Sequence, residues 1–393
     1  MKRRQILTAG ALGAGALGAG ALAAVPAAAQ ARGPKQDDRD KRTPPGLAKK
    51  DTLAFAAGTT LKIGSAVAGG GHHTSQPYPP PFTDDETYRE HLATEFTSLS
   101  AENQMKWDHL RPDRDTFAFA DADAIMDFAT EHGQDVRGHT LLWHSQNPAW
   151  LEEGDFSADE LRALLKEHID TVVGRYRGRI SQWDVANEIF DDDGNLRTSD
   201  NIWIRELGVE IVADAFRWAR AADPGALLFF NDYNVDGINA KSDAYYALIP
   251  DLLADGVPVD GFSTQGHLSI EYGFPGDITE NLQRFADLGL HTAVTELDVR
   301  MPLPDGAEPT EAQLAQQADY YRRVTEAALA VDGCDSLTLW GFVDTYSWVP
   351  ATFEGQGAAC VLWEDYTRKP AYHAVQDALA EASGRADHPA LRD

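Results

Sequence analysis

Cysteine and positive charge are both scarce in this sequence of 393 residues. Its two cysteines, Cys334 and Cys360, can form at most one disulfide within the chain, and a pair of buried free thiols is equally compatible with them. Lysine and arginine number 34 against 62 aspartates and glutamates, so the formal net charge is -28. Such a surface repels nucleic acid and anionic lipid and favours a neutral or cationic ligand, so we expect no nucleic-acid partner.

The start of the chain has the pattern of an export signal. A basic opening at residues 1–4 is followed by an uncharged run over about residues 6–25 and by the small-residue site Ala29-Gln30-Ala31. This pattern predicts a secretory signal peptide over residues 1–31, and the pair Arg3-Arg4 suggests the twin-arginine route rather than the general one. The run is too weakly hydrophobic to favour a membrane anchor. We therefore expect a secreted protein that has no contact with a membrane after cleavage.

Residues 32–55 form the next segment, which is charged, contains several prolines and holds few large apolar residues. A segment of that composition cannot bury a core, so we expect a disordered leader.

A glycine-rich phosphate loop is also lacking, since Gly69-Gly70-Gly71-His72-His73 does not have the required spacing. Strand and helix patterns alternate through the rest of the chain. The predicted strands are 61–67, 96–100, 135–142, 180–186, 227–230, 259–265, 291–298 and 336–340, and the predicted helices are 84–93, 121–131, 158–175, 203–222, 241–254, 277–288, 310–330 and 370–382. Eight such repeats predict a single α/β domain, a (β/α)8 TIM barrel, over residues 56–385 with a C-terminal tail at 386–393. An open doubly wound sheet is the alternative.

Polar residues gather where the predicted strands end. Glu188 follows the fourth strand and Glu296 ends the seventh, so both should lie at the C-terminal face of the barrel, where barrel enzymes work. Tryptophans there provide apolar faces for a sugar ring, while amide, imidazole and carboxylate groups bind its hydroxyls. Two glutamates opposed across such a site indicate cleavage of a glycosidic bond, with one as general acid and the other as nucleophile or base.

Each of these residues also has a reading without catalysis. Asn187-Glu188 could be a capping pair at the end of a strand. His139 and His144 could bind zinc, but a spacing of five along a strand should turn their rings to opposite faces. We expect His72 and His73 to be solvated, and Trp150 and Trp203 to pack in the core or a loop.

Several segments resemble, in order and spacing, the signatures of glycoside hydrolase family 10. They are Glu102-Asn103-Gln104-Met105-Lys106-Trp107, Gly138-His139-Thr140-Leu141-Leu142-Trp143-His144-Ser145-Gln146, Trp183-Asp184-Val185-Ala186-Asn187-Glu188, Thr295-Glu296-Leu297-Asp298, Trp340-Gly341 and Ser347-Trp348. The resemblance covers roughly residues 60–382. It implies a retaining endo-β-1,4-xylanase on a (β/α)8 barrel, which acts on xylan and xylo-oligosaccharides and needs no metal and no cofactor.

The resemblance also implies roles for individual residues. Glu188 would be the acid/base and Glu296 the nucleophile, with His267 and Asp298 positioning Glu296 and keeping it ionised. The substrate-binding residues it implies are Glu102, Asn103, Lys106, His139, Trp143, Asn187, Gln265, Trp340 and Trp348. Two positions depart from the family pattern: Gln104 stands where an acidic residue is frequent, and Ala186 where valine is common.

Two further functions remain open at this point. One is a cellulase or mixed-glucan hydrolase on the same barrel, and the other is a sugar-binding barrel without catalysis. We expect the protein to be a monomer whichever of these functions it has.

Overall fold

The computed structural model describes residues 49–70 and 79–391. The predicted signal peptide and most of the predicted leader lie outside the described residues, as do His72 and His73. The predicted end of the leader at residue 55 is wrong. Helix α2 (Leu53–Ala57) begins before it, Leu53 and Ala54 are fully buried, and the Leu53 N–H donates to Glu95 Oε2 at 2.9 Å. A short run of small apolar residues is therefore part of the folded core.

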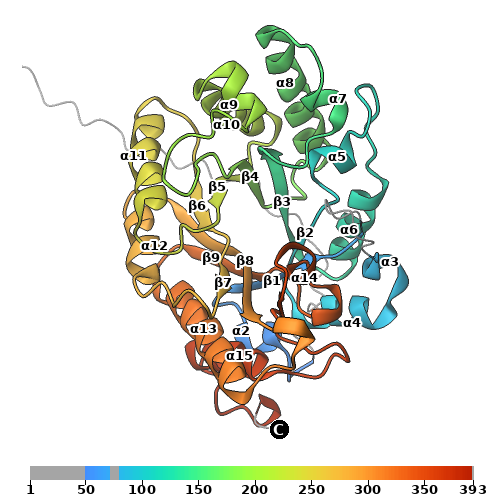
Figure 1. Ribbon diagram of the computed structural model, residues 1–393, viewed down its shortest axis with the longest axis vertical. Helices are drawn as coiled ribbons and strands as arrows, with labels where there is room; N and C mark the ends of the chain where they lie inside the picture. Colours follow the sequence, from blue (N-terminus) through green and yellow to red (C-terminus); the bar gives the residue numbers. More distant parts are fainter. Residues whose placement is uncertain (1–48, 71–78, 392–393) are drawn as a thin grey trace, which may run out of the picture. The chain divides into compact units, whose positions relative to one another are not determined.

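Eight parallel strands close into a barrel, as the alternation predicts. Each strand pairs with its neighbour, and β9 pairs with both β8 and β1 to complete the ring (Figure 1). The barrel strands are β1 (Lys62–Val67), β2 (Ser98–Ala101), β3 (Asp135–Leu142), β4 (Gln182–Asn187), β5 (Leu227–Asp232), β6 (Gly261–Thr264), β8 (His291–Pro302) and β9 (Cys334–Leu339). Two short strands lie off the ring and pair with β8: β7 (His267–Ser269) and β10 (Gln356–Gly357).

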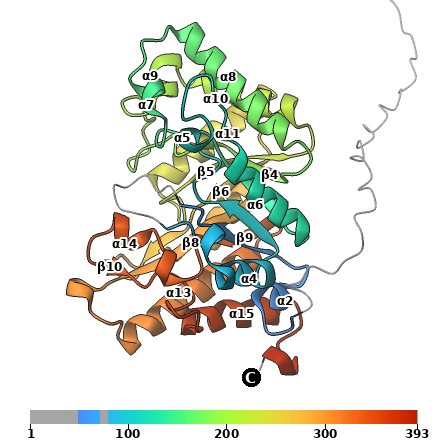
Figure 2. The ribbon, with the colours of Figure 1, turned by 90° about the vertical axis from the view of Figure 1, so that its right-hand side faces the viewer.

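Helices surround the barrel, and Figure 2 shows them from the side. They are α2, α3 (Pro81–Asp84), α4 (Glu86–Glu95), α5 (Trp107–Leu110), α6 (Ala120–Glu131), α7 (Ala149–Glu152), α8 (Ala158–Arg175), α9 (Ile202–Leu207), α10 (Glu210–Ala222), α11 (Ala240–Ala254), α12 (Ile278–Ala286), α13 (Glu311–Ala330), α14 (Val349–Thr352) and α15 (Pro370–Ala382). Short 3₁₀ turns occupy Pro304–Gly306, Asp344–Tyr346 and Pro389–Leu391.

Local sequence chemistry sets several helix boundaries. Ser157 and Glu160 form a capping box at the start of α8, and Thr310 and Gln313 form another at the start of α13. The single helix predicted over 203–222 is in fact two, because Gly208 between α9 and α10 has a φ of +75° that other residues rarely adopt.

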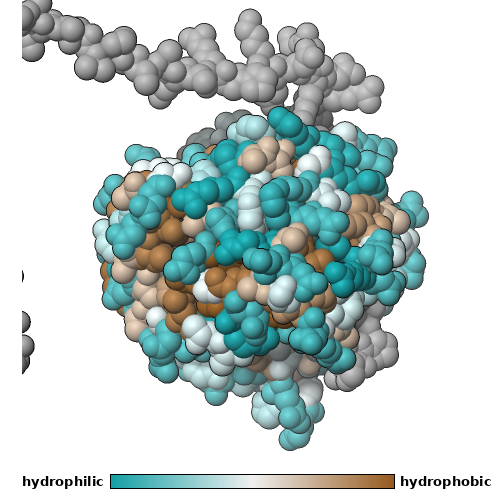
Figure 3. All heavy atoms as spheres, turned by 90° about the horizontal axis from the view of Figure 1, so that it is seen from above, coloured by the Kyte–Doolittle hydropathy of each residue, from teal (hydrophilic) through white to brown (hydrophobic). Residues whose placement is uncertain are grey.

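The core consists of the apolar faces between strands and helices. Its largest fully buried side chains include Trp183 and Trp203, and Trp150 packs against its edge, as predicted for Trp150 and Trp203. Cys334 and Cys360 are free thiols. Among the described residues, no helix is long and apolar enough to cross a membrane. The side of the barrel that carries α8, α9 and α10 shows hydrophilic residues around a band of hydrophobic ones (Figure 3).

Candidate active site

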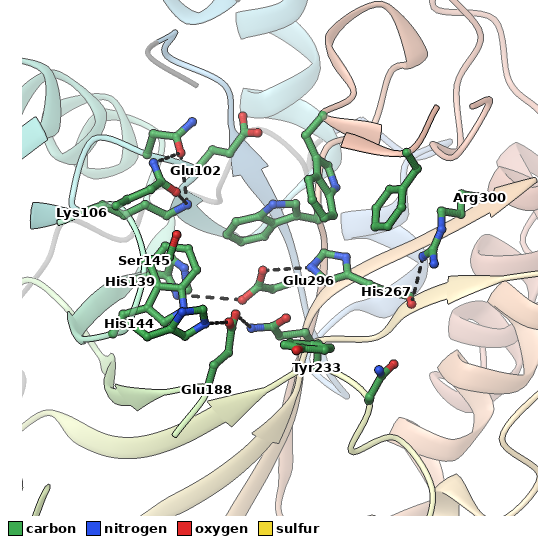
Figure 4. Close-up of a pocket in the computed structure, with 18 of the residues that line it drawn as sticks. Glu102, Lys106, His139, His144, Ser145, Glu188, Tyr233, His267, Glu296 and Arg300 are labelled. Atoms are coloured by element: carbon green, nitrogen blue, oxygen red, sulfur yellow. Dashed lines mark hydrogen bonds and ion pairs between the residues drawn. The ribbon is translucent and has the colours of Figure 1, made fainter. Parts of the chain in front are cut away.

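A pocket of about 410 Å³ opens among the strand ends that the sequence singled out. Its lining comes from the segments that follow β2, β3, β4, β5, β6 and β9 and from β3, β7 and β8 themselves. The lining residues are Glu102, Asn103, Lys106, His139, Trp143, His144, Ser145, Gln146, Glu188, Asp192, Tyr233, Asn234, Gln265, His267, Glu296, Arg300, Trp340, Trp348 and Phe353. Both predicted catalytic glutamates are in this group, and Figure 4 shows that they lie close together.

Glu188 is placed by the sharp end of β4. Its φ of +54° lies in the left-handed region, where residues other than glycine are uncommon and where functional sites often store strain. Glu188 is buried, with 7% of the residue exposed. Gln265 Nε2 donates to its Oε1 at 2.9 Å, and His144 Nε2 lies 2.9 Å from its Oε2 (Figure 4). Glu188 is therefore held from both sides but remains open to the pocket.

Glu296 sits on β8 and is 4% exposed. Asn231 Nδ2 donates to its Oε1 at 2.8 Å, and His267 Nε2 lies 3.2 Å from its Oε2. His139 Nδ1 is farther away, at 3.9 Å from Oε1. Each carboxylate oxygen of Glu296 thus has one close partner.

Two asparagines connect the glutamates. Asn187 Nδ2 donates to Glu188 Oε1 at 3.1 Å, and Asn231 Nδ2 donates to Asn187 Oδ1 at 2.9 Å as well as to Glu296. The side-chain bonds run without a break from one carboxylate to the other. A displacement of either glutamate would disturb its partner's hydrogen bonds.

His267 lies between two carboxylates. Its Nδ1 is 3.0 Å from Asp298 Oδ2 and its Nε2 faces Glu296, so only a protonated ring can donate to both. Burial alone would lower the pKa of His267, but the charges and hydrogen bonds of Asp298 and Glu296 raise it to about 10. Trp348 Nε1 also donates to Asp298 Oδ2, at 2.8 Å. The geometry therefore favours a persistent imidazolium beside Glu296.

The environment of Glu188 acts differently. Burial raises the pKa of Glu188, but hydrogen bonds from His144 and Gln265 outweigh burial, so the pKa is lowered. Among the described residues, no carboxylate other than Glu188 lies within ion-pair distance of His144. His144 Nε2 therefore has Glu188 Oε2 as its ion-pair partner.

Lys106 lies on another wall of the pocket and is fully enclosed. Its Nζ donates to Asn103 Oδ1 at 3.1 Å and to Gln146 Oε1 at 2.8 Å, and it lies 4.9 Å from the Trp143 ring centroid. Gln104, which departs from the family pattern, instead donates to the Gly70 carbonyl at 2.9 Å. Burial lowers the pKa of Lys106, and the negative charges around it, led by that of Glu296, act in the opposite direction.

Each predicted site residue lies in or directly beneath this pocket. Asn187 and Asp298 do not line the pocket but contact two residues that do, Glu188 and His267. Among the described residues, no group of three or more histidine, cysteine, aspartate or glutamate side chains is placed to hold a metal ion.

The sequence reasoning missed several residues of the site. They include His144 as a partner of Glu188, Asn231 as a donor to Glu296, and Tyr233, Arg300 and Phe353 in the lining. The prediction that His139 and His144 face opposite ways is wrong, because β3 ends at Leu142 and strand alternation does not reach His144. Asn231 and Tyr233 could have been found from their position at the end of β5, by the same rule that identified Glu188.

Comparison with known proteins shows a consistent set of relatives. The family model described as glycosyl hydrolase family 10 matches residues 54–378. The chain is 39% identical over 340 residues to an endo-1,4-beta-xylanase of Agaricus bisporus. This alignment covers 86% of this chain and 96% of that protein. It is 40% identical over 321 residues to endo-1,4-beta-xylanase B of Thermotoga neapolitana, over 82% of this chain and 90% of that protein.

Solved structures agree with these sequence relatives. Native xylanase 10B from Thermotoga maritima superposes with a TM-score of 0.77 at 38% identity, covering 85% of this chain and 100% of that one. Xylanase 10B from Thermotoga petrophila RKU-1, solved in complex with xylobiose, also has a TM-score of 0.77 at 38% identity, covering 84% of this chain and 97% of that one.

Proposed function

The chain belongs to glycosyl hydrolase family 10 and hydrolyses xylan as an endo-1,4-β-xylanase, and from this premise we propose a double displacement with two distinct glutamates. Glu296 is the nucleophile and Glu188 is the acid and base. The observation that carries this assignment is the contrast between their histidines. The histidine beside Glu296 is backed by a buried aspartate, whereas in the described part of the chain no second carboxylate lies within ion-pair distance of the one beside Glu188.

In the first step, Glu296 attacks the anomeric carbon and Glu188 protonates the leaving oxygen. Glu296 must be ionised to attack, and the imidazolium of His267 stabilises its charge. The bond between the anomeric carbon and the leaving oxygen breaks as the bond to the Glu296 oxygen forms. The products of this step are a covalent glycosyl-enzyme and a shortened xylan chain.

In the second step, water attacks the anomeric carbon and Glu188 accepts its proton. Glu296 leaves as a carboxylate, and two inversions give a product with retained configuration. Asn187 Nδ2 donates to Glu188 Oε1 at 3.1 Å. We propose that its side chain bonds the 2-hydroxyl of the sugar under attack, a contact that strengthens in the transition state.

The lowered pKa of Glu188 suits the second step, because it favours the ionised base. The first step needs a proton on the same carboxyl. We propose that a bound sugar excludes water and makes a charged carboxylate beside the ionised Glu296 less favourable, so that Glu188 takes up a proton at Oε2.

Three tryptophans and a histidine support xylose as the sugar. Trp143 and Trp340 flank His139, with ring centroids 6.1 and 5.4 Å from its own, and Trp348 packs on His267 at 4.9 Å. We propose that Trp340 and Trp348 close over the reacting sugar and leave little room for the hydroxymethyl group of glucose. Glu102, Asn103, Lys106, His139 and Trp143 would bind the non-reducing-side sugars, and Gln265 the reacting one.

We further propose that the protein is secreted through the N-terminal signal peptide and acts as a monomer without metal or cofactor. Size-exclusion chromatography with light scattering of the purified protein would give the oligomeric state. N-terminal sequencing of protein recovered from culture medium would show whether cleavage occurs after about residue 31.

A digest of unsubstituted xylan tests the proposal as a whole. We expect early release of a range of xylo-oligosaccharides, as an endo enzyme gives, and β-anomers as the first products in proton NMR. Release of reducing ends from carboxymethyl cellulose should be far slower. Early α-anomers would contradict double displacement, equal rates on both polymers would favour a glucanase, and uncut xylan would indicate a binding barrel.

A further inference from the structure

Arg300 is a buried cation for which the proposed mechanism has no use. Three arginines are buried among the described residues: Arg111, Arg137 and Arg300. Arg111 Nη2 donates to Glu167 at 2.7 Å, and Arg137 binds Asp184 through both Nε and Nη2. Arg300, 9% exposed, has no carboxylate within ion-pair distance in the described part of the chain. A buried charge without a counter-ion is costly unless something else compensates it.

The contacts that Arg300 does make are weak. Its Nη1 lies 3.4 Å from the carbonyls of His267 and Leu268, which is long for a charge-assisted hydrogen bond. Its Cζ lies 4.0 Å from the Phe353 ring centroid, a stacking distance. Nε is buried with no hydrogen-bond partner, and Nη2 donates to none of the described residues. Most of the donor capacity of the guanidinium is therefore unused.

Arg300 lies where its unused donors can reach a substrate. Arg300 and Phe353 both line the catalytic pocket. Figure 4 shows Arg300 on the far side of His267 from Glu296, away from Glu102 and Lys106. Lys106 differs from it, because two side-chain oxygens already bind its Nζ. Arg300 is thus the lining cation whose charge is not satisfied by its neighbours in the described residues.

The chemistry of the guanidinium identifies the ligand class. A neutral sugar hydroxyl stabilises a cation little more than water does. A planar carboxylate, in contrast, matches the geometry of the guanidinium group and can accept two hydrogen bonds from it. The rest of the protein is strongly acidic and repels an anionic polymer, so recognition of a substrate carboxylate needs a local positive group. Xylan carries carboxylates when uronic acids substitute its xylose units.

We propose that Arg300, stacked on Phe353, forms a subsite for the carboxylate of a uronic-acid side group on the xylan chain. The proposal rests on the proposed xylanase function and adds a preference for acidic over neutral chains at this end of the pocket. Binding involves no covalent step.

The test compares three soluble substrates of equal backbone length: a xylo-oligosaccharide with one glucuronic acid side group, the same compound with its carboxyl reduced to an alcohol, and the unsubstituted chain. For the unaltered enzyme, we expect kcat/KM on the acidic substrate to exceed that on the reduced one by about tenfold, the size of one charge-assisted interaction. Arg300→Gln should bring the ratio of the two near one. In 1 M NaCl the preference of the unaltered enzyme should shrink.

Arg323→Gln is the matched control, since Arg323 also stacks on a phenylalanine, Phe274, at 3.6 Å but does not line the pocket. It changes net charge equally and should keep the preference. Arg300→Lys keeps the positive charge but loses the planar guanidinium, so it should keep part of the preference for the acidic substrate. An acidic-to-reduced ratio near one in the unaltered enzyme would overturn the proposal even if no Arg300 variant folds, and so would a ratio that Arg300→Gln leaves intact. Failure to cleave the unsubstituted chain would instead contradict the proposed function itself.

Discussion

The two sides of the catalytic pocket use the same pair of groups, a glutamate and a histidine, in different settings. On the Glu296 side, His267 has a second carboxylate behind it, and the resulting pKa of about 10 keeps the ring charged at neutral pH. On the Glu188 side, His144 bonds the glutamate at a similar distance but has no such support among the described residues.

This difference supports the opposite tasks that we propose for the two glutamates. A histidine that stays charged at neutral pH favours the anion of Glu296, as a nucleophile requires. A histidine without a second carboxylate leaves Glu188 freer to alternate between acid and base, as both steps of a double displacement require. The identity of the histidine's second partner is therefore the basis of the proposed roles.

The largest effect should come from removal of either glutamate. Glu296→Ala should lower kcat/KM on xylan by at least about 10⁴-fold, because the covalent step is lost. Glu188→Ala should lose on the order of 10²–10⁴-fold on xylan but much less on an aryl xyloside whose leaving group needs no proton. Steady-state rates on both substrates measure this. Equal losses on the aryl xyloside for the two variants would break the proposed contrast.

Removal of the support behind His267 should have the next largest effect. Asp298→Asn takes away the leading charge that raises the pKa of His267, so the ring should become neutral near pH 7 and no longer place a positive charge beside Glu296. The acid limb of the kcat/KM profile should move to higher pH by roughly one unit, with a loss of about tenfold at pH 5.

Asp335→Asn provides the control for that variant, because Asp335 faces His291 at 3.0 Å near the starts of β9 and β8 and does not line the pocket. Its pH profile should match that of the unaltered enzyme. An unshifted acid limb in Asp298→Asn would mean that His267 does not govern the ionisation of Glu296.

Removal of His144 should affect the opposite limb. His144→Gln removes the hydrogen bond and charge that lead the lowering of the pKa of Glu188, so the pKa of Glu188 should rise. We expect the basic limb of kcat/KM to move to higher pH while the acid limb stays in place. A shift of the acid limb instead would contradict the distinction between the Glu188 side and the Glu296 side of the pocket.

The smallest effect concerns stability. The pKa of His267 is about 10 in the folded protein against 6.5 when unperturbed, so its contribution is complete below about pH 6.5 and is lost as pH rises through 10. Between pH 7 and pH 10, the melting temperature of the unaltered protein should fall by a few degrees more than that of the His267→Gln variant. Parallel curves for the two proteins would contradict this.

Much of the site follows from strand periodicity and the positions of strand ends. Alternation predicts the eight barrel strands, and the rule that side chains gather at strand ends finds Glu188 and Glu296. The role of His144 could not be predicted in this way, since it lies beyond the end of β3, where alternation stops. Arg300 was missed because its place in the pocket depends on how far β8 extends past Glu296.

Contacts between segments that are far apart in the sequence are harder to predict from it. The link from Glu188 through Asn187 and Asn231 to Glu296 joins three strands whose residues are 44 and 65 positions apart, and only the closed barrel brings them together. The same is true of α2, whose burial depends on contacts with α15 and not on its own short apolar run.

Chemical rescue by azide tests the division of labour most directly. Azide should restore the activity of Glu188→Ala on an aryl xyloside and give a glycosyl azide of retained configuration, because the covalent intermediate on Glu296 still forms. Rescue of Glu296→Ala should give the inverted azide by direct displacement. Product configuration by proton NMR decides the matter, and exchanged outcomes for the two variants would contradict the roles assigned to Glu188 and Glu296.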